Sequence, residues 1–360
     1  MAGAPPQAFA HEAPPAEMTS ADVTIESSGE KVRLDGLEDH TPVEVMDHHI
    51  SHGGRPDAQA PIGIMGDHVQ KKGSIMLSYR YTRMEMDGNR SGTDDISTAD
   101  VLERFMVAPT NMTMEMHMFG LMYGLSDDAN LMVMVPYIEK SMDHVTRTGV
   151  RFTTGSEGVG DVTLAGLFKL FDNGSHRLHL NAGLSFPTGS IDERDATPAD
   201  PNARLPYPMQ IGSGTYDLLP GITYTGFSEE YSWGAQASGT VRLGENDRSY
   251  TFGNRLNLTA WGARPLTGWL SASLRVAWRA WEDVDGADPA LNPAMVQTAD
   301  PDRQSGQRVD LIFGINALLP SGPLKRNQLG VEIGVPGYQD LDGPQLETDW
   351  TVAAGWRVRF

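Results

Sequence analysis

The residues with the clearest chemical potential are methionines in the stretch MTMEMHMFGLMYG, which spans 112–124. All five methionines of this stretch fall on even positions: Met112, Met114, Met116, Met118 and Met122. A thioether sulfur is a soft ligand that favours Cu(I) or Ag(I) over Zn(II), Mg(II) or Ca(II). The chain has 18 methionines, of which 13 lie between Met65 and Met142. This local enrichment predicts a methionine-lined surface, whose chemistry depends on the direction in which these side chains point.

Composition excludes several classes of protein. The chain has 360 residues, a formal net charge of −19 and no cysteine. An acidic chain lacks the basic footprint that binds nucleic acid, so no nucleic-acid partner is expected. The absence of cysteine excludes disulfides and thiolate metal sites and is compatible with an oxidising compartment. No run of about 20 consecutive apolar residues occurs, so no transmembrane helix is predicted.

The N-terminal part divides into two predicted segments. Residues 1–10 end in Ala8-Phe9-Ala10, which has the small-x-small form of a signal-peptidase site. We interpret 1–10 as the remnant of a signal peptide; a disordered Ala/Pro-rich terminus is the alternative. Residues 11–72 are rich in Pro, His and Asp and show little periodicity, so they are expected to form an irregular leader.

From residue 73 onward, apolar and polar residues alternate with a period of two, which is typical of strands with two different faces. Twelve segments show this pattern: 73–87, 112–125, 130–145, 161–171, 177–189, 216–227, 231–243, 254–264, 269–282, 308–319, 328–339 and 349–360.

The connections between these segments alternate in length. The odd-numbered ones are long and full of Gly, Asp and Pro, as in 190–215 and 283–307, whereas the even-numbered ones are short, as in 126–129 and 265–268. An even strand count with short turns on one side and long loops on the other is typical of a transmembrane β-barrel. The sequence therefore predicts an all-β, antiparallel up-and-down barrel over 73–360 in the bacterial outer membrane. A soluble barrel or sandwich, with the apolar face inside, is the alternative.

In a membrane barrel the apolar face contacts lipid and the other face lines the lumen. Phe119, Leu121 and Tyr123 would then face lipid, and the even-numbered methionines would face the lumen. The short turn at 126–129 predicts that Met122 lies opposite Met132 or Met134, and that Met114 lies opposite Met142 or Lys140. Three neighbouring strands would together form a methionine wall. Its candidate metal ligands are Met84, Met86, Met112, Met114, Met116, Met118, Met142 and His144.

Three interpretations of the methionine wall remain open. A row of weak, similar thioether sites would suit the passage of a soft ion, because each site must be easy to enter and to leave. The same wall would suit an apolar passage for small aromatic compounds. Methionine is also an adaptable space-filler, so the wall could simply line the lumen. No cofactor is required by any of these, and Cu(I) or Ag(I) would be a transported or bound ion.

The leader offers two further candidate metal-binding motifs. Residues 61–72 directly precede the first predicted strand, so they are expected to fold into the periplasmic mouth as a plug. We predict that Met65 or His68, in the stretch Met65-Gly66-Asp67-His68, reaches the methionine wall. The second motif combines Met46, His48, His49 and His52.

Charged residues occupy lumen-facing positions on the strands opposite the methionine wall. The candidates for a lumen charge network are Arg242, Arg275, Arg279, Asp310 and Glu332. Such mixed charges form salt bridges across a lumen, and they could instead constrict a pore and bias its ion choice.

The sequence does not predict an enzyme. A barrel lipase needs a serine within hydrogen-bond reach of a histidine on the lipid face. His117 has the required parity, but no serine is expected beside it. A passive metal-binding or structural outer-membrane protein remains a further alternative to a channel.

Four stretches carry a resemblance to a known family: APIGIMGDH (60–68), RLPYPMQIGSGTYDLLPGITYTG (204–226), MVQTADPDRQ (295–304) and QLETDWTVAAGWRVRF (345–360). They resemble outer-membrane transporters named for the meta-cleavage pathway of phenol degradation, over about residues 60–360. The resemblance implies a barrel in outer-membrane lipid, uptake of a small solute and no catalytic residues. Members rich in Met and His look like a subgroup with copper as partner, for which a periplasmic metal-handling protein would be a further partner.

Overall fold

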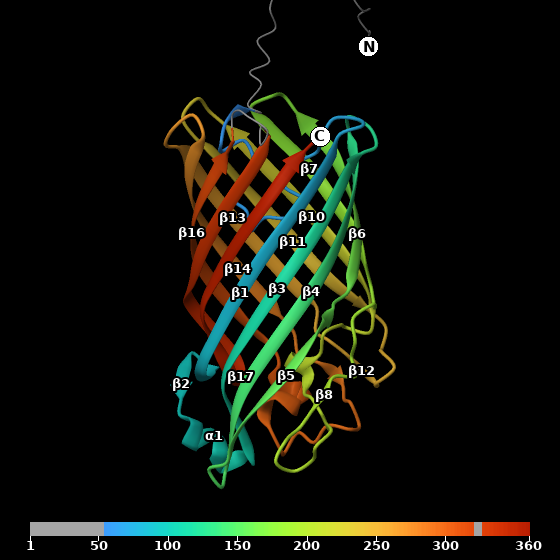
Figure 1. Cartoon of the computed structure of the whole chain (residues 1–360), viewed down its shortest axis with the longest axis vertical. Coiled ribbons are helices and arrows are strands. Elements are labelled where there is room, and N and C mark those ends of the chain that lie inside the picture. The colour runs from blue at the N-terminus through green and yellow to red at the C-terminus, as the bar shows by residue number, and fades with distance from the viewer. Residues whose placement is uncertain (1–53, 320–325) are drawn as a thin grey trace, which may run out of the picture. The chain divides into compact units, whose positions relative to one another are not determined.

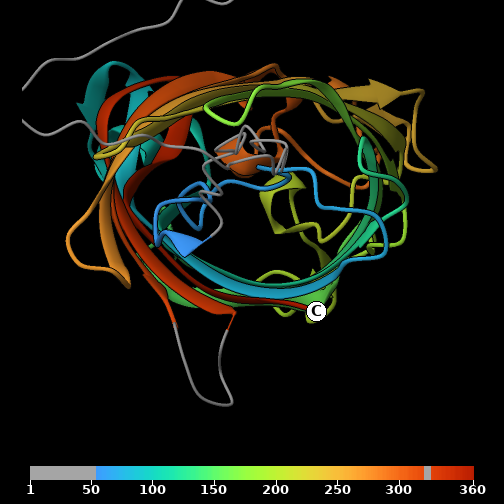
Figure 2. The ribbon, with the colours of Figure 1, turned by 90° about the horizontal axis from the view of Figure 1, so that it is seen from above.

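A computed structural model describes residues 54–319 and 326–360. These residues belong to one compact unit, which is a closed antiparallel β-barrel (Figures 1 and 2). The signal-peptide remnant predicted at 1–10, and the motif with Met46, His48, His49 and His52, lie outside the described residues.

Eleven strands make the barrel wall. In spatial order they are β1 (Ile75–Gly92), β3 (Val107–Gly124), β4 (Ala129–Thr146), β6 (Val162–Asp172), β7 (His176–Phe186), β10 (Tyr216–Phe227), β11 (Ser232–Leu243), β13 (Arg255–Pro265), β14 (Leu270–Trp281), β16 (Gly306–Leu318) and β17 (Asn327–Arg359).

The wall closes because β17 crosses it twice. The first arm of β17 pairs with β16 up to Leu341, and the second arm pairs with β1, from Leu341 opposite Gly92 to Arg359 opposite Met76. Eleven strands, one of which crosses twice, give twelve passes in the described wall. This agrees with the twelve predicted segments, and closure leaves no strand edge to be satisfied in lipid.

The remaining elements lie at one end of the barrel, at the bottom of Figure 1. They are β2 (Asp94–Ile96), α1 (Thr98–Arg104), β5 (Arg151–Val159), β8 (Arg194–Asp195), β9 (Ala203–Arg204), η2 (Tyr207–Met209), β12 (Tyr250–Thr251), β15 (Asp285–Gly286), η3 (Gln297–Ala299) and η4 (Pro301–Arg303). Short turns join the strands at the other end, where the C-terminus also lies. In outer-membrane barrels the short turns are periplasmic and the long loops are extracellular.

Several strands are longer than the apolar pattern predicts. β1 continues to Gly92, β3 begins at Val107, and most of the predicted connection 146–160 is strand β5, which pairs with β4. The outward face of these extensions is polar: Arg83 pairs with Glu85 and Glu115, and Glu115 lies opposite Glu139. The strands therefore continue beyond the lipid, where the alternation of apolar and polar residues ends before the strand does.

The outward face of the wall is an apolar belt. Large apolar side chains are more than a third exposed on it, as for Phe119, Leu121, Leu258 and Phe313. Aromatic residues such as Tyr79, Tyr81 and Trp233 lie toward the ends of this belt, as in the aromatic girdles of membrane barrels. A closed barrel with an apolar outer belt is a bacterial outer-membrane protein.

No helix among the described residues is long and apolar enough to span a membrane.

Candidate functional site

The methionine wall lies on β1, β3 and β4, in the predicted register. Met122 lies opposite Met132, and Met114 lies opposite Lys140. On the other side of β3, Met84 lies opposite Met114 and Met86 opposite Met112. Directly opposed Cβ atoms on antiparallel strands are about 4.5–5.5 Å apart, so neighbouring thioethers can touch.

The wall is divided into two packed clusters. The periplasmic cluster consists of Met76, Met122, Met132, Ala165 and Leu167, with Val69 and Met134 packed against it. The extracellular cluster consists of Met112, Met142, Leu205 and Met209, with Met86 and Leu346 packed against it. Met84, Met114, Met116 and Met118 lie between the clusters and are half-buried.

Met209 is a member that the sequence analysis did not assign. It belongs to η2, in the long loop between β7 and β10, and its side chain is fully buried. This loop enters the barrel from the extracellular end, where Lys140 Nζ donates to the carbonyls of Pro208 at 2.7 Å and Gln210 at 2.6 Å. Ser156 Oγ donates to the carbonyl of Met209 at 2.7 Å. The extracellular cluster is thus built by four wall strands, β1, β3, β4 and β17, and one loop.

His144 lies at the extracellular edge of this region. It is opposite Pro109, across a bulge from Met112, and its ring stacks on Phe152 with the centroids 4.8 Å apart. The ring is buried, and Nδ1 has no hydrogen-bond partner among the described residues.

The leader residues 54–72 cross the inside of the barrel near the periplasmic end, where they appear blue in Figure 2. Their backbone is bound by side chains from around the wall. Glu332 accepts from the N–H of Gly63 at 2.6 Å, and Arg80 donates to the carbonyl of Ile64 at 3.1 Å. Gln236 donates to the carbonyl of Met65 at 2.9 Å. The leader therefore occupies the lumen as a plug, over a longer range than 61–72.

In the leader, Val69 and Gln70 contact the wall methionines. Val69 packs against the periplasmic cluster, and Gln70 Nε2 lies 3.1 Å from the sulfur of Met122. The carbonyl of Met65 instead accepts a hydrogen bond from Gln236, and the ring of His68 contacts Asp67. His68 does share one cavity with Met76 of the wall.

The predicted lumen charges occur as ion pairs. Arg275 binds Glu332 through two hydrogen bonds of 2.9 Å, Arg279 pairs with Asp310, and Arg242 pairs with Asp217. The leader adds a pair that was not predicted, since Asp67 lies 3.3 Å from Arg357 of β17. Burial raises the pKa of Asp67, but the facing Arg357 and His68 outweigh burial and hold that pKa well below its usual range.

Among the residues that the structure covers, no group of three or more His, Cys, Asp or Glu side chains is arranged to hold a metal ion. The thioether sulfurs of the methionine wall are soft donors, which select soft ions.

Comparison with known proteins supports the barrel. An outer membrane channel from Pseudomonas putida F1 superimposes with a TM-score of 0.57 at 12% sequence identity, over 82% of this chain and 99% of that one. A FadL homologue of Pseudomonas aeruginosa (TM-score 0.40, 11% identity, 86% of this chain and 97% of that one) and the CymD monoaromatic hydrocarbon channel (0.37, 8%, 81% and 89%) are more distant. At these identities the likeness is one of fold, and only the first structure supports it. No family model and no curated protein matches the chain.

Proposed function

We propose that the protein is an outer-membrane channel for a small solute, and that its methionine-lined side binds a soft monovalent ion, Cu(I) or Ag(I). The proposed first site of contact is the set Met86, Met112, Met142 and Met209. Met84, Met114, Met116 and Met118 would continue the path toward the periplasm, and a periplasmic metal-handling protein would receive the ion. The resemblance to outer-membrane transporters of the phenol-degradation family is compatible with this class.

The observation that carries this proposal is the position of Met209. Three wall strands already supply thioethers, and a loop from elsewhere in the sequence adds another sulfur to the same cluster. A lining that only needs to be filled could use leucine there, as it does at the neighbouring Leu205. Several thioethers around one point are a donor set for a soft ion, because no hard oxygen ligand is required.

Passage requires movement of the plug. The leader is bound to the wall inside the lumen by hydrogen bonds and by the Asp67–Arg357 ion pair, and we propose that it closes the route in the resting protein. The contacts that bind Gly63 and Ile64 are to backbone groups, which can be released without breaking any strand. We therefore expect low conductance from the resting protein.

A second candidate cargo is a small apolar solute. Both clusters mix methionine with aliphatic side chains, namely Ala165 and Leu167 in one and Leu205 and Leu346 in the other. Such a surface binds apolar molecules by burial, at roughly 25 cal/mol per Å² of apolar area. This candidate does not require sulfur, so replacing methionine with leucine would leave it intact.

The test is Ag(I) binding by the purified full chain, measured by calorimetry. In the test variant Met86, Met112, Met142 and Met209 are replaced by Leu, a swap of similar volume that costs less than about 1.5 kcal/mol per site. In the control variant Met76, Met122 and Met132 of the periplasmic cluster are replaced by Leu. We expect the test variant to lose tight Ag(I) binding and the control to retain it.

Three outcomes would contradict the proposal of a soft-ion channel. Equal Ag(I) affinity in the parent and the test variant would assign these methionines to packing. The route would be assigned to apolar solutes by a combination of two results. Vesicles that contain the test variant would take up a small aromatic hydrocarbon as well as the parent does, and the parent would show no Ag(I) flux. A parent that binds Ag(I) but conducts no ion after removal of the plug contacts would be a passive metal-binding protein.

A further inference from the structure

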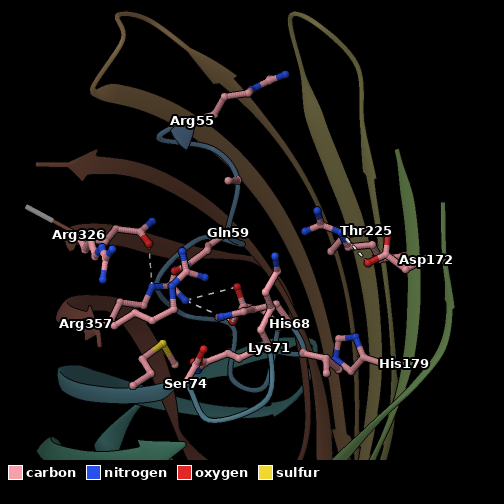
Figure 3. A pocket seen from close by; sticks show the side chains of 18 of the residues that line it. Arg55, Gln59, His68, Lys71, Ser74, Asp172, His179, Thr225, Arg326 and Arg357 are labelled. Atoms are coloured by element: carbon pink, nitrogen blue, oxygen red, sulfur yellow. Dashed lines mark hydrogen bonds and ion pairs between the residues drawn. The ribbon is translucent and has the colours of Figure 1, made fainter. Parts of the chain in front are cut away.

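A cavity of about 830 Å³ opens at the periplasmic mouth, between the leader and the barrel wall (Figure 3). The leader, β1, β7, β16 and β17 all contribute to its lining, so segments far apart in the sequence meet there. Figure 3 shows His68 and Lys71 of the leader, His179 of β7 and Arg357 of β17 around this space. Its volume is in the usual range for small-molecule sites, which is about 300–1,000 Å³.

The lining is basic, although the whole chain carries a formal charge of −19. Seven arginines and lysines line the cavity, against three aspartates. The cations are Arg55, Lys71, Lys169, Arg177, Arg326, Arg357 and Arg359, and the aspartates are Asp67, Asp127 and Asp172. A hollow with this excess of positive charge attracts anions and repels cations.

Some of these cations are already neutralised. Arg357 pairs with Asp67 at 3.3 Å, and Arg177 pairs with Asp172 at 3.6 Å. Lys71, Arg326 and Arg359 have no carboxylate partner within the part of the chain that the structure describes. These three cations leave positive charge available to a ligand in the cavity.

His68 is the second observation that points to a ligand. Its Nδ1 lies 3.0 Å from the carboxylate of Asp67, which makes Nδ1 the donor in that contact. The other ring nitrogen, Nε2, is buried and has no hydrogen-bond partner in 54–319 or 326–360. The whole residue is only 9% exposed, and it lines the cavity. A buried polar atom without a partner is rare, so this nitrogen leaves a position at the cavity wall for a polar ligand group.

The geometry points to an anion-binding site at this mouth, with Lys71, Arg359 and His68 as its ligand-contacting residues. The ligand class is a small solute with a carboxylate or phosphate group, because the cavity is bounded on several sides and its size suits a small molecule. The cavity borders the periplasmic methionine cluster at Met76 and Val69, whereas the methionines proposed to bind the ion form the cluster at the other end of the lumen. The existence of the site does not depend on the cargo proposed above. The positive charge of this lining would repel a soft cation.

The experiment titrates the purified full chain with inorganic phosphate at pH 7 and constant ionic strength, followed by calorimetry. The test variant combines Lys71→Gln with Arg359→Gln. The control combines Arg151→Gln with Arg194→Gln, which removes the same charge from β5 and β8 at the opposite end of the barrel. We expect saturable binding by the parent and the control, and affinity weakened about tenfold or more in the test variant.

A parent that binds no phosphate, or that binds phosphate no better than chloride at the same ionic strength, would overturn this inference. Equal weakening in the test and control variants would also overturn it, because the effect would then be one of net charge. The outcome is separate from Ag(I) binding, which uses the methionine variants and the opposite half of the lumen.

Discussion

Glycines on the inner face of β17 make room for a leader side chain. A Cβ added at Gly330 would lie 2.7 Å from Cβ of Ile62, and one added at Gly355 would overlap the same side chain. The buried Ile62 is only 3% exposed. Lumen-facing glycines in the sequence were therefore a sign that another segment occupies that part of the lumen.

Gly63→Ala is expected to loosen the plug. A Cβ at Gly63 would overlap the carboxylate of Glu332 and the guanidinium of Arg275, which bind each other and cannot both move away cheaply. Overpacking of this kind costs roughly 1–3 kcal/mol, which shifts the docked leader toward release by about fivefold to about 150-fold. Single-channel recording in planar bilayers should show more frequent or larger openings than the parent.

The matched control is Gly54→Ala, because a Cβ at Gly54 meets no atom within 4 Å. Both variants remove one glycine from the leader, so their effects on the unfolded chain are similar. If both behave like the parent, the contact at Gly63 does not control the opening.

From the depressed pKa of Asp67 we predict how the stability of the protein responds to acid. Its pKa is depressed in the folded protein, so its contribution to stability is fully present above the ordinary carboxyl pKa of about 3.9 and is lost as the pH falls below that value. The parent should therefore keep a constant unfolding midpoint from pH 7 to about pH 5 and lose stability below about pH 4. Denaturant unfolding followed by tryptophan fluorescence measures this.

Asp67→Asn removes the titrating group. This variant should be less stable than the parent at pH 7, because it leaves Arg357 without its carboxylate partner. Its stability should also fall less steeply below pH 4. Parallel pH profiles for the two proteins would show that Asp67 is not responsible for the acid response.

At the scale of elements, one lysine makes two of the hydrogen bonds that bind the loop between β7 and β10 to the barrel. Lys140 of β4 donates to two loop carbonyls, those of Pro208 and Gln210, and these bonds position Met209. Lys140→Met removes both donors and keeps an unbranched side chain. Hydrogen bonds to charged groups contribute about 1.5–3 kcal/mol, so the loop should open at least about tenfold more often.

The chain has no cysteine, so a single introduced thiol reports on this loop alone. Met209→Cys should react slowly with a water-soluble maleimide, because the residue is fully buried. Adding Lys140→Met should raise that rate about tenfold, whereas adding Lys169→Met at the periplasmic end should not. An unchanged rate with Lys140→Met would mean that other contacts position the loop.

At the scale of the whole molecule, the sequence predicted the wall well because parity is a local property. The turn at 126–129 limited the partner of Met122 to Met132 or Met134 and that of Met114 to Met142 or Lys140. The structure has Met132 and Lys140 at these positions. Strand ends were predicted less well, because the outward face becomes polar at Arg83 and Glu115 while the hydrogen-bonded ladder continues. The alternation of apolar and polar residues shows where the lipid-facing part of a strand ends, and the strand itself continues beyond that point.

The contents of the lumen could not be predicted in the same way. Met209 and Asp67 lie far in the sequence from the residues they meet, and no periodicity connects a loop or leader to a wall position. In the sequence, the stretch with Met209 is distinguished only by its resemblance to a family. Packing between distant segments is decided by the closed barrel as a whole.

The orientation of the barrel gives the last prediction. Its long loops should face the medium and its short turns the periplasm, because outer-membrane barrels have short periplasmic turns and longer extracellular loops. Asp200→Cys lies between β8 and β9 at the long-loop end, and Glu229→Cys lies in the short turn between β10 and β11. Both positions are exposed, so access to the reagent depends only on the side of the membrane. An impermeant maleimide added to intact cells should label Asp200→Cys at once, and Glu229→Cys only after the outer membrane is permeabilised. The reverse result would place the basic cavity outside the cell and the loop with Met209 inside, and would invert the direction of every step proposed for the lumen.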